Sequence, residues 1–240
     1  QTETLIIESG NEPRTIPTPA DPLKIIEDEL EGLNYLGFDD QTRFSGGAVG
    51  FVSYEYANRV EPTVPIHQKD ELNLPMLYFM IADLVLVFDH AHQSLTICAN
   101  STPGDDPESA YREACARIKE IIDLLASPSN LTPASINGAE TIENVSGNLS
   151  KEEFEDLVLK TKEFIRSGDI IQAVLSQRFS LPYSGPPINL YRAIRAINPS
   201  PYMFLLEGDD FAVVGASPEV HVRLTGEDVL IRPIAGTRPR

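Results

Sequence analysis

Polar side chains stand beside proline or glycine at several points in the last part of the chain, and such residues could form a reaction site. Three segments show the pattern: Asn198-Pro-Ser-Pro201, Gly215-Ala-Ser-Pro-Glu219 and Pro233-Ile-Ala-Gly-Thr-Arg-Pro-Arg240. Each lies at the end of an apolar stretch, so the segments are either rigid turns between strands or the polar wall of a pocket. In a pocket, the Glu219 carboxyl could act as an acid or base, Gly236 would let a ligand reach main-chain groups, and Thr237 would supply a hydroxyl.

The rest of the chain shows no complete pattern for nucleophilic or metal-dependent catalysis, and no glycine-rich phosphate loop. Among the four histidines, His90 and His92 are closely spaced, but they fall in an expected hairpin turn, so a turn role is favoured over a metal site. Cys98 and Cys115 lie in apolar surroundings on a predicted strand and helix, which favours buried, reduced thiols. We therefore expect a cytoplasmic protein and no metal ligand in this chain.

The composition predicts a folded, acidic protein. The 240 residues are 42% hydrophobic, which is enough apolar material for a core. The formal net charge of −17 argues against a nucleic-acid or anionic-membrane partner, because phosphate groups would be repelled. The sequence has no apolar run of the ~18 residues needed to span a bilayer, and no basic region followed by an apolar one at its start. We expect neither nucleic acid nor membrane as a partner.

The first half of the chain predicts two helices and a group of antiparallel strands. Asp21 and Pro22 signal the start of a helix, which apolar spacing carries to about Leu33. A second helix is predicted over residues 107–126. Strands are predicted over residues 46–57, 76–89 and 94–100, and the last two should form a hairpin.

A change of composition divides the chain into two portions. Residues 127–149 are rich in Ser, Pro, Asn, Thr and Gly, which predicts a linker between an N-terminal portion, residues 1–126, and a second portion, residues 150–240. Ser150 and Glu153 have the spacing of a capping box at the start of a helix that ends near Gly168. Beyond it we expect a short helix over residues 188–197 and strands over 170–181, 202–207, 211–215, 220–224 and 228–233. Strands separated by tight turns predict a mainly antiparallel α+β fold.

Five ordered motifs over residues 45–240 carry a resemblance to a known family. Three of them are the segments named first, and the other two are residues 45–50 (Ser45-Gly-Gly-Ala-Val-Gly50) and 168–179 (Gly168-Asp-Ile-Ile-Gln-Ala-Val-Leu-Ser-Gln-Arg-Phe179). Together these motifs resemble those of the chorismate-utilising enzymes, in particular component I of anthranilate synthase. The resemblance implies a sandwich of antiparallel sheets with helices packed outside. It also implies that the sequence stops before the metal-binding half of such enzymes, so we expect these 240 residues alone to be inactive.

Within the resemblance, two positions bear on the reaction. This chain has Gln172 at a position where relatives that add water to chorismate look as though they carry a lysine. Such enzymes need a base there, because water must be deprotonated to attack the ring. Ammonia needs no such base, so Gln172 favours an amino-transferring enzyme. The alternative interpretation is that Gln172 is a plain polar residue of a strand. The related aminodeoxychorismate synthases often carry a motif similar to Pro-Ile-Lys-Gly-Thr where this chain has alanine at Ala235. In those relatives the lysine attacks the ring and forms a covalent bond. Ala235 therefore favours direct attack by ammonia and anthranilate as the product.

The resemblance also implies a mechanism and a site. Ammonia would add at ring carbon 2 as the carbon 4 hydroxyl leaves, and the enolpyruvyl group would then be lost as pyruvate. Glu219 would stand near the leaving hydroxyl as proton donor, and Ala235, Gly236 and Thr237 would lie against the substrate. Burial would favour the protonated form that Glu219 needs. Family members use Mg²⁺, whose glutamate ligands are expected downstream of residue 240.

Regulation and partners follow from the same resemblance. Pro201, Tyr202 and Met203 match a segment that binds feedback tryptophan, and an apolar wall suits an indole, although the residues could be plain strand positions. Residues 5–9 resemble a second element of that effector site, but Ser9 stands too close to Ser45 for the usual spacing, so coincidence is favoured. A separate glutamine amidotransferase subunit, component II, would supply ammonia. The alternatives are an aminodeoxychorismate synthase component I and a non-catalytic tryptophan-binding module.

Overall fold

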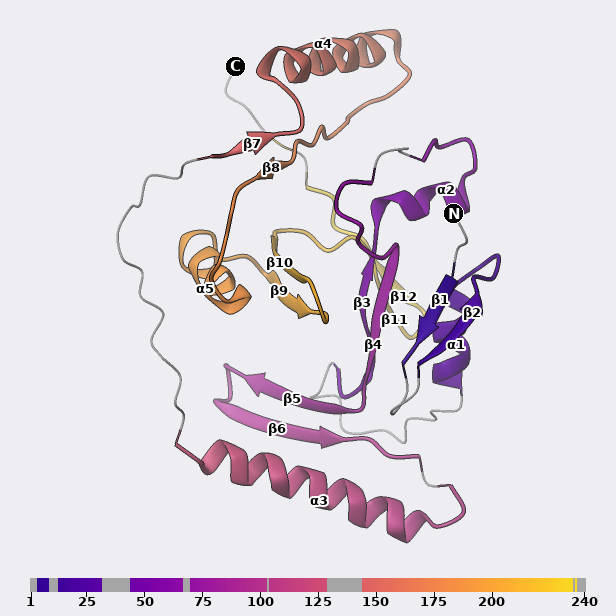
Figure 1. Ribbon diagram of the computed structural model, residues 1–240, viewed down its shortest axis with the longest axis vertical. Helices are drawn as coiled ribbons and strands as arrows, with labels where there is room; N and C mark the ends of the chain where they lie inside the picture. Colours follow the sequence, from indigo (N-terminus) through magenta and orange to yellow (C-terminus); the bar gives the residue numbers. More distant parts are fainter. Residues whose placement is uncertain are drawn as a thin grey trace. The chain divides into compact units, whose positions relative to one another are not determined.

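The computed structural model of the chain describes residues 4–8, 13–31, 44–66, 70–102, 104–128, 144–234 and 236. The chain forms two compact units, an N-terminal unit (residues 1–130) and a C-terminal unit (residues 131–240). Both combine helices with antiparallel strand pairs, which confirms the predicted α+β class (Figure 1). Over the described residues the strands pair two by two in six sheets. The predicted linker, residues 127–149, lies largely outside the described residues.

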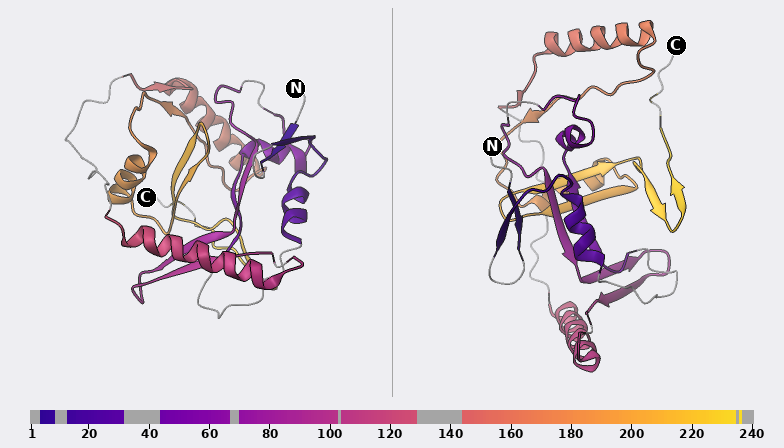
Figure 2. Two further views of the ribbon diagram at one scale, coloured as in Figure 1. Left: turned by 60° about the horizontal axis from the view of Figure 1, so that its bottom comes forward. Right: turned by 90° about the vertical axis from the view of Figure 1, so that its right-hand side faces the viewer.

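The N-terminal unit is built from strand pairs and the helices that accompany them. Its described elements are β1 (Thr4–Ile7), β2 (Arg14–Pro17), α1 (Leu23–Glu31), β3 (Gly47–Val52), η1 (Tyr54–Tyr56), α2 (Ala57–Val60), β4 (Leu77–Ala82), β5 (Leu84–Asp89), β6 (Ser94–Ala99) and α3 (Pro107–Ala126). The pairs are β1 with β2, β3 with β4 and β5 with β6, so the predicted hairpin ending near residue 100 is confirmed. Helix α3 contacts β6 and runs beside the β5–β6 hairpin (Figure 2).

Local signals set the ends of the helices in this unit. The Asp21 carboxylate accepts a hydrogen bond from the backbone N–H of Leu23 at 3.1 Å, which confirms the predicted start of α1. The Asp106 carboxylate accepts from the backbone N–H of Ser109 at 3.1 Å, and Pro107 occupies the first turn of α3. The predicted range of α3 agrees with the observed one.

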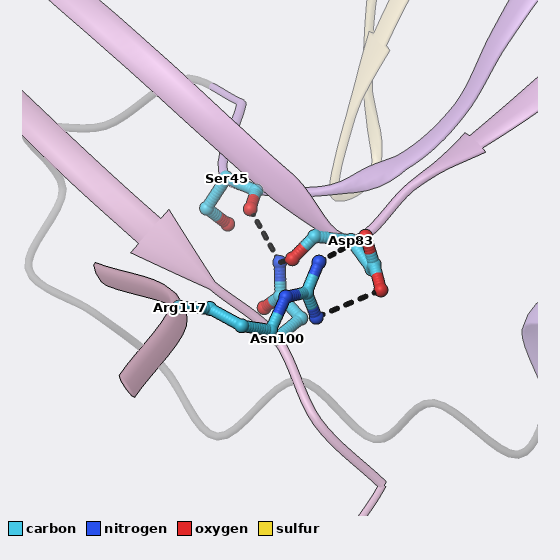
Figure 3. A network of polar contacts seen from close by, with 4 residues as sticks. All are labelled: Ser45, Asp83, Asn100 and Arg117. Atoms are coloured by element: carbon cyan, nitrogen blue, oxygen red, sulfur yellow. Dashed lines mark hydrogen bonds and ion pairs between the residues drawn. The ribbon is translucent and has the colours of Figure 1, made fainter. Parts of the chain in front are cut away.

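The predicted strand over residues 76–89 is two strands, because the chain turns at Asp83. The Arg117 guanidinium on α3 donates two hydrogen bonds to the Asp83 carboxylate, at 2.9 and 2.8 Å (Figure 3). The Asn100 side-chain amide donates to the backbone carbonyls of Ser45 at 2.6 Å and Asp83 at 3.3 Å. The Arg117 hydrogen bond lowers the pKa of the Asp83 carboxyl. This polar network joins α3 to the β4–β5 junction and to the chain that enters β3.

The C-terminal unit begins with a well-capped helix. Its described elements are β7 (Ser146–Gly147), α4 (Lys151–Ser167), β8 (Phe179–Ser180), α5 (Pro187–Ile197), β9 (Tyr202–Glu207), β10 (Ala212–Ser217), β11 (Arg223–Thr225) and β12 (Asp228–Leu230). Ser150 and Glu153 form the predicted capping box, and Gly168 ends α4 with φ of 86°, a left-handed conformation that glycine adopts without strain. Both predicted ends of α4 are confirmed.

The strand pairs of this unit are shorter than the sequence predicts. Instead of a strand over residues 170–181, only β8 forms, paired with β7, and the preceding residues 170–178 form no regular strand. Its apolar side chains are exposed, with Ile171 at 96% and Val174 at 86%. The strand predicted over 220–224 begins at Arg223, and that predicted over 228–233 ends at Leu230. Helix α5 contacts both β9 and β10.

The described residues bury little apolar surface. Pro22 and Ala114 are the buried positions among them. The thiols of Cys98 and Cys115 are both free, but the expectation that both are buried is wrong, because Cys98 is half-buried and Cys115 is exposed. No helix within the described ranges has the length and apolar character needed to cross a membrane.

Candidate functional site

Two of the three polar segments meet at one end of the β9–β10 hairpin. In the antiparallel register, Tyr202 lies opposite Ser217 and Met203 lies opposite Ala216. The first residues of β9 therefore stand beside the last residues of β10, so the segment ending at Pro201 and the turn carrying Glu219 lie at the same end of this pair. Strand pairing thus brings together residues that are far apart in the sequence.

A hydrogen bond connects the third segment to this end of the hairpin. The Glu219 carboxylate oxygen Oε1 accepts a hydrogen bond from the backbone N–H of Ile234 at 3.0 Å. Ile234 comes two residues before Gly236, so the carboxyl group that the sequence proposes as a proton donor is held at the start of the segment proposed to contact substrate. The first two polar segments and Ile234 of the third therefore come together in the C-terminal unit.

The surroundings of Glu219 are only partly those that a buried acid requires. The residue is half-buried, so the described residues do not provide the full burial that the sequence analysis expected. Its Oε1 atom is used by Ile234, whereas no hydrogen bond within the described residues uses Oε2. One carboxyl oxygen is thus held by a backbone N–H, and the other accepts no hydrogen bond within the described residues.

The remaining candidates against the substrate are less well defined. Gly236 is exposed, and a side-chain carbon built on it would meet no atom within 4 Å. There is therefore open space beside this backbone for a ligand. Ala235 and Thr237 lie outside the described residues, so their predicted contacts with substrate stay predictions.

Gln172 stands apart from the cluster in its contacts. It is exposed in the irregular stretch between α4 and β8, and its side chain makes no hydrogen bond with the described residues. The structure does not join Gln172 to Glu219 by any such bond, and its role stays a prediction.

The proposed effector residues are divided between two faces of β9. Successive side chains of a strand point to opposite faces, so those of Tyr202 and Met203 cannot line the same face. The Tyr202 side chain is 44% exposed, whereas Met203 is half-buried. Pro201 precedes the strand and is exposed. A ligand that touches all three must therefore sit at the start of the strand. Ser9 lies outside the described residues.

Sequence reasoning included Ser217 and Ile234 in the polar segments but assigned a role to neither. The Ser217 hydroxyl donates a hydrogen bond to the Glu219 carbonyl at 3.0 Å and accepts one from the Glu219 backbone N–H at 3.4 Å. A serine two residues before Glu219 has the spacing of a side-chain turn, so the sequence contained a usable signal. A backbone donor 15 residues away carries no signal in the sequence.

His92 contributes to the turn between β5 and β6 through its contact with Asp89. His92 Nδ1 lies 2.8 Å from Asp89 Oδ2 in the β5–β6 turn, and this partner raises the pKa of His92. In the described part of the chain, no three His, Cys, Asp or Glu side chains group closely enough to hold a metal ion.

The fold and these motifs define a member of a known class. The family described as chorismate binding enzyme matches residues 3–240. The chain belongs to this family, which confirms the resemblance that the motifs predicted.

Named relatives narrow the comparison. The chain is 39% identical to anthranilate synthase component 1 of Acetivibrio thermocellus over 99% of its length, covering 48% of that protein. It is 37% identical to the Saccharomyces cerevisiae protein of that name, covering 92% of this chain and 44% of the other. The crystal structure of anthranilate synthase component I from Streptococcus pneumoniae TIGR4 matches with a TM-score of 0.71 and 25% identity, covering 95% of this chain and 51% of that chain. The chain spans about half the length of the curated relatives it matches.

Proposed function

We propose that the full-length gene product converts chorismate and ammonia into anthranilate and pyruvate, the first committed step of tryptophan biosynthesis. Membership of the chorismate-binding family supports the substrate, and the names of the relatives support the product. Gln172 and Ala235 support the same product, because neither side chain can activate water or form a covalent bond to the ring.

In this reaction, ammonia forms a bond to ring carbon 2 while the bond from carbon 4 to its hydroxyl breaks. The hydroxyl takes a proton and leaves as water, and the amine loses a proton. The ring carbon 2 proton is then removed, its electron pair forms a double bond to carbon 3, and the bond from carbon 3 to the enolpyruvyl oxygen breaks. The ring is then aromatic, and the released enolpyruvate takes a proton on its methylene carbon to become pyruvate. A positioned acid is needed in the first step, because hydroxide is a poor leaving group.

The observation that carries the proposal is the hydrogen bond from Ile234 to Glu219. It fixes Oε1 at 3.0 Å from the Ile234 nitrogen and leaves Oε2 to carry the donated proton. The carboxyl group is thereby held at Ile234, two residues before Gly236 in the sequence, and we propose that the carbon 4 hydroxyl of chorismate lies beside it. A carboxyl group held by the segment proposed to bind substrate is suited to proton donation. A glutamate with no role beyond the turn would need no such partner, because its side chain could simply face solvent.

From the family resemblance we further propose Mg²⁺ as cofactor, a glutamine amidotransferase subunit as partner and tryptophan as inhibitor. Within the described residues no three suitable ligands group together, so we derive no step through the ion. The proposal that its ligands lie downstream of residue 240 rests on the family resemblance alone. A glutamine amidotransferase subunit would supply ammonia from glutamine. Tryptophan would inhibit by binding at Pro201, Tyr202 and Met203. The free thiols of Cys98 and Cys115 support a reducing, cytoplasmic location.

Product identification tests the proposal. The full-length gene product is incubated with chorismate, an ammonium salt and Mg²⁺, and the products are separated and identified by mass. We expect anthranilate and pyruvate in equal amounts. Aminodeoxychorismate without pyruvate would assign the chain to the related synthase. Tryptophan binding with no product from chorismate would assign it to a non-catalytic effector-binding module.

A further inference from the structure

We propose that Ser217 is a positioning residue for the reaction, which acts by holding Glu219 in place. Ser217 is the last residue of β10 and is half-buried. Its hydroxyl makes two contacts with the backbone of Glu219, donating to the carbonyl at 3.0 Å and accepting from the N–H at 3.4 Å. One side chain therefore fixes both polar backbone groups of the residue that carries the carboxyl. The inference rests on the proposed function of Glu219.

The chain of contacts continues from Glu219 to the substrate segment. With its backbone fixed, Glu219 reaches the Ile234 N–H at 3.0 Å through Oε1. Ser217 is held in turn by strand pairing, since it lies opposite Tyr202 in the β9–β10 register. The Ser217 hydroxyl thus links the end of the β9–β10 pair to the irregular turn that carries Glu219. Positioning of this kind matters because a small displacement of a proton donor slows the transfer.

A role in positioning differs from a general contribution to folding. Ser217 touches no other described side chain through a hydrogen bond, and its two contacts both end on Glu219. Loss of the hydroxyl should therefore alter the placement of Glu219 and Ile234 while β9 and β10 stay paired. A net contribution typical of one hydrogen bond corresponds to roughly a two- to tenfold change in rate.

The activity test uses Ser217→Ala in the full-length gene product, with Ser217→Thr to restore a hydroxyl. Ser184→Ala is the matched control, because Ser184 is exposed in the same unit and its hydroxyl makes no hydrogen bond within the described residues. We expect kcat for anthranilate formation to fall about fivefold in Ser217→Ala, with KM for chorismate changed less than about twofold. Ser217→Thr should regain most of the rate. A wild-type rate in Ser217→Ala, or the same loss in Ser184→Ala, contradicts the proposal.

A second readout does not depend on activity. Deuterium uptake of a peptide containing Ile234 should rise in Ser217→Ala and in Glu219→Ala, and the double variant should match Glu219→Ala alone, because Ser217 acts through Glu219. Peptides from β9 should be unchanged. Unaltered uptake at Ile234 in Ser217→Ala, or additive effects in the double variant, would overturn the inference. If the wild type forms no anthranilate, the proposed function fails, and the uptake measurement still decides the role of Ser217.

Discussion

The side chain of Asn100 offers a well-defined perturbation, because it holds the chain before β3 by a single amide. Its Nδ2 atom donates to the Ser45 carbonyl at 2.6 Å and to the Asp83 carbonyl at 3.3 Å. Asn100→Ala removes both bonds and leaves the part-buried Ser45 carbonyl to find water. The backbone bond from Asn100 N–H to the Asp83 carbonyl, at 2.7 Å, is kept. The variant thus detaches Ser45 without breaking the β5–β6 pair.

The size of the effect follows from the burial of the lost bond. An unpaired buried polar group costs about 1–3 kcal/mol, and partial burial places this case near the lower end, at about 1–1.5 kcal/mol. If this cost falls on local opening of β3 from β4, the β3 amides should exchange roughly five- to twelvefold faster. Hydrogen exchange in the full-length gene product, read on peptides spanning residues 47–52, measures it.

Two controls make the test specific. Thr102→Ala changes a nearby exposed side chain that makes no hydrogen bond within the described residues, and it should leave exchange in β3 unaltered. Arg117→Lys replaces the bidentate pair with Asp83 by a single contact, and should alter α3 more than β3. Exchange in β3 within about twofold of wild type in Asn100→Ala, or an equal rise in β9 and β10, would refute the reasoning.

Other predictions concern a turn, a close contact and a helix cap. The hydrogen bond with His92 lowers the pKa of Asp89 to about 2, and Asp89 raises the pKa of His92 above 6.5, so their pairing should be complete between about pH 4 and 6.5. Above this range the pairing is lost as the pH rises through the raised pKa of His92 and the imidazole loses its proton. Below it the pairing is lost as the pH falls through the lowered pKa of Asp89 and the carboxylate gains one. Asp89→Asn should return the His92 pKa towards 6.5 in an NMR titration. Gly50→Ala should cost about 3 kcal/mol and lower Tm, because the added carbon would strike the backbone carbonyl of Tyr78. Ser150→Ala should cost about 1 kcal/mol and raise amide exchange in the first turn of α4 only.

Elements with local signals could be predicted from the sequence. The capping box at Ser150 and the left-handed Gly168 fix both ends of α4 by contacts within a few residues. The same holds for α3, which starts at an aspartate cap followed by proline. These contacts form whatever the rest of the chain does, so pattern and structure agree.

Elements that depend on distant partners could not be predicted in the same way. The turn at Asp83 is stabilised by Arg117, 34 residues away, which apolar periodicity does not reveal. The stretch with Ile171 and Val174 has the composition of a strand, but a strand forms only where a partner offers its backbone. At the candidate site, sequence motifs identified Glu219, but the Ile234 amide that holds it is a backbone group with no side-chain signature.

Anthranilate formation by Glu219→Gln tests the central role of Glu219 most directly. Glutamine keeps an oxygen that can accept from the Ile234 N–H, but its amide N–H groups are not acidic enough to transfer a proton to a leaving hydroxyl. Glu227→Gln, an exposed glutamate in the β11–β12 turn of the same unit, is the matched control. We expect the full-length wild type and Glu227→Gln to form anthranilate equally, and Glu219→Gln to lose at least about a hundredfold in kcat. Activity of Glu219→Gln within a fewfold of wild type would contradict the assignment of Glu219 as the proton donor.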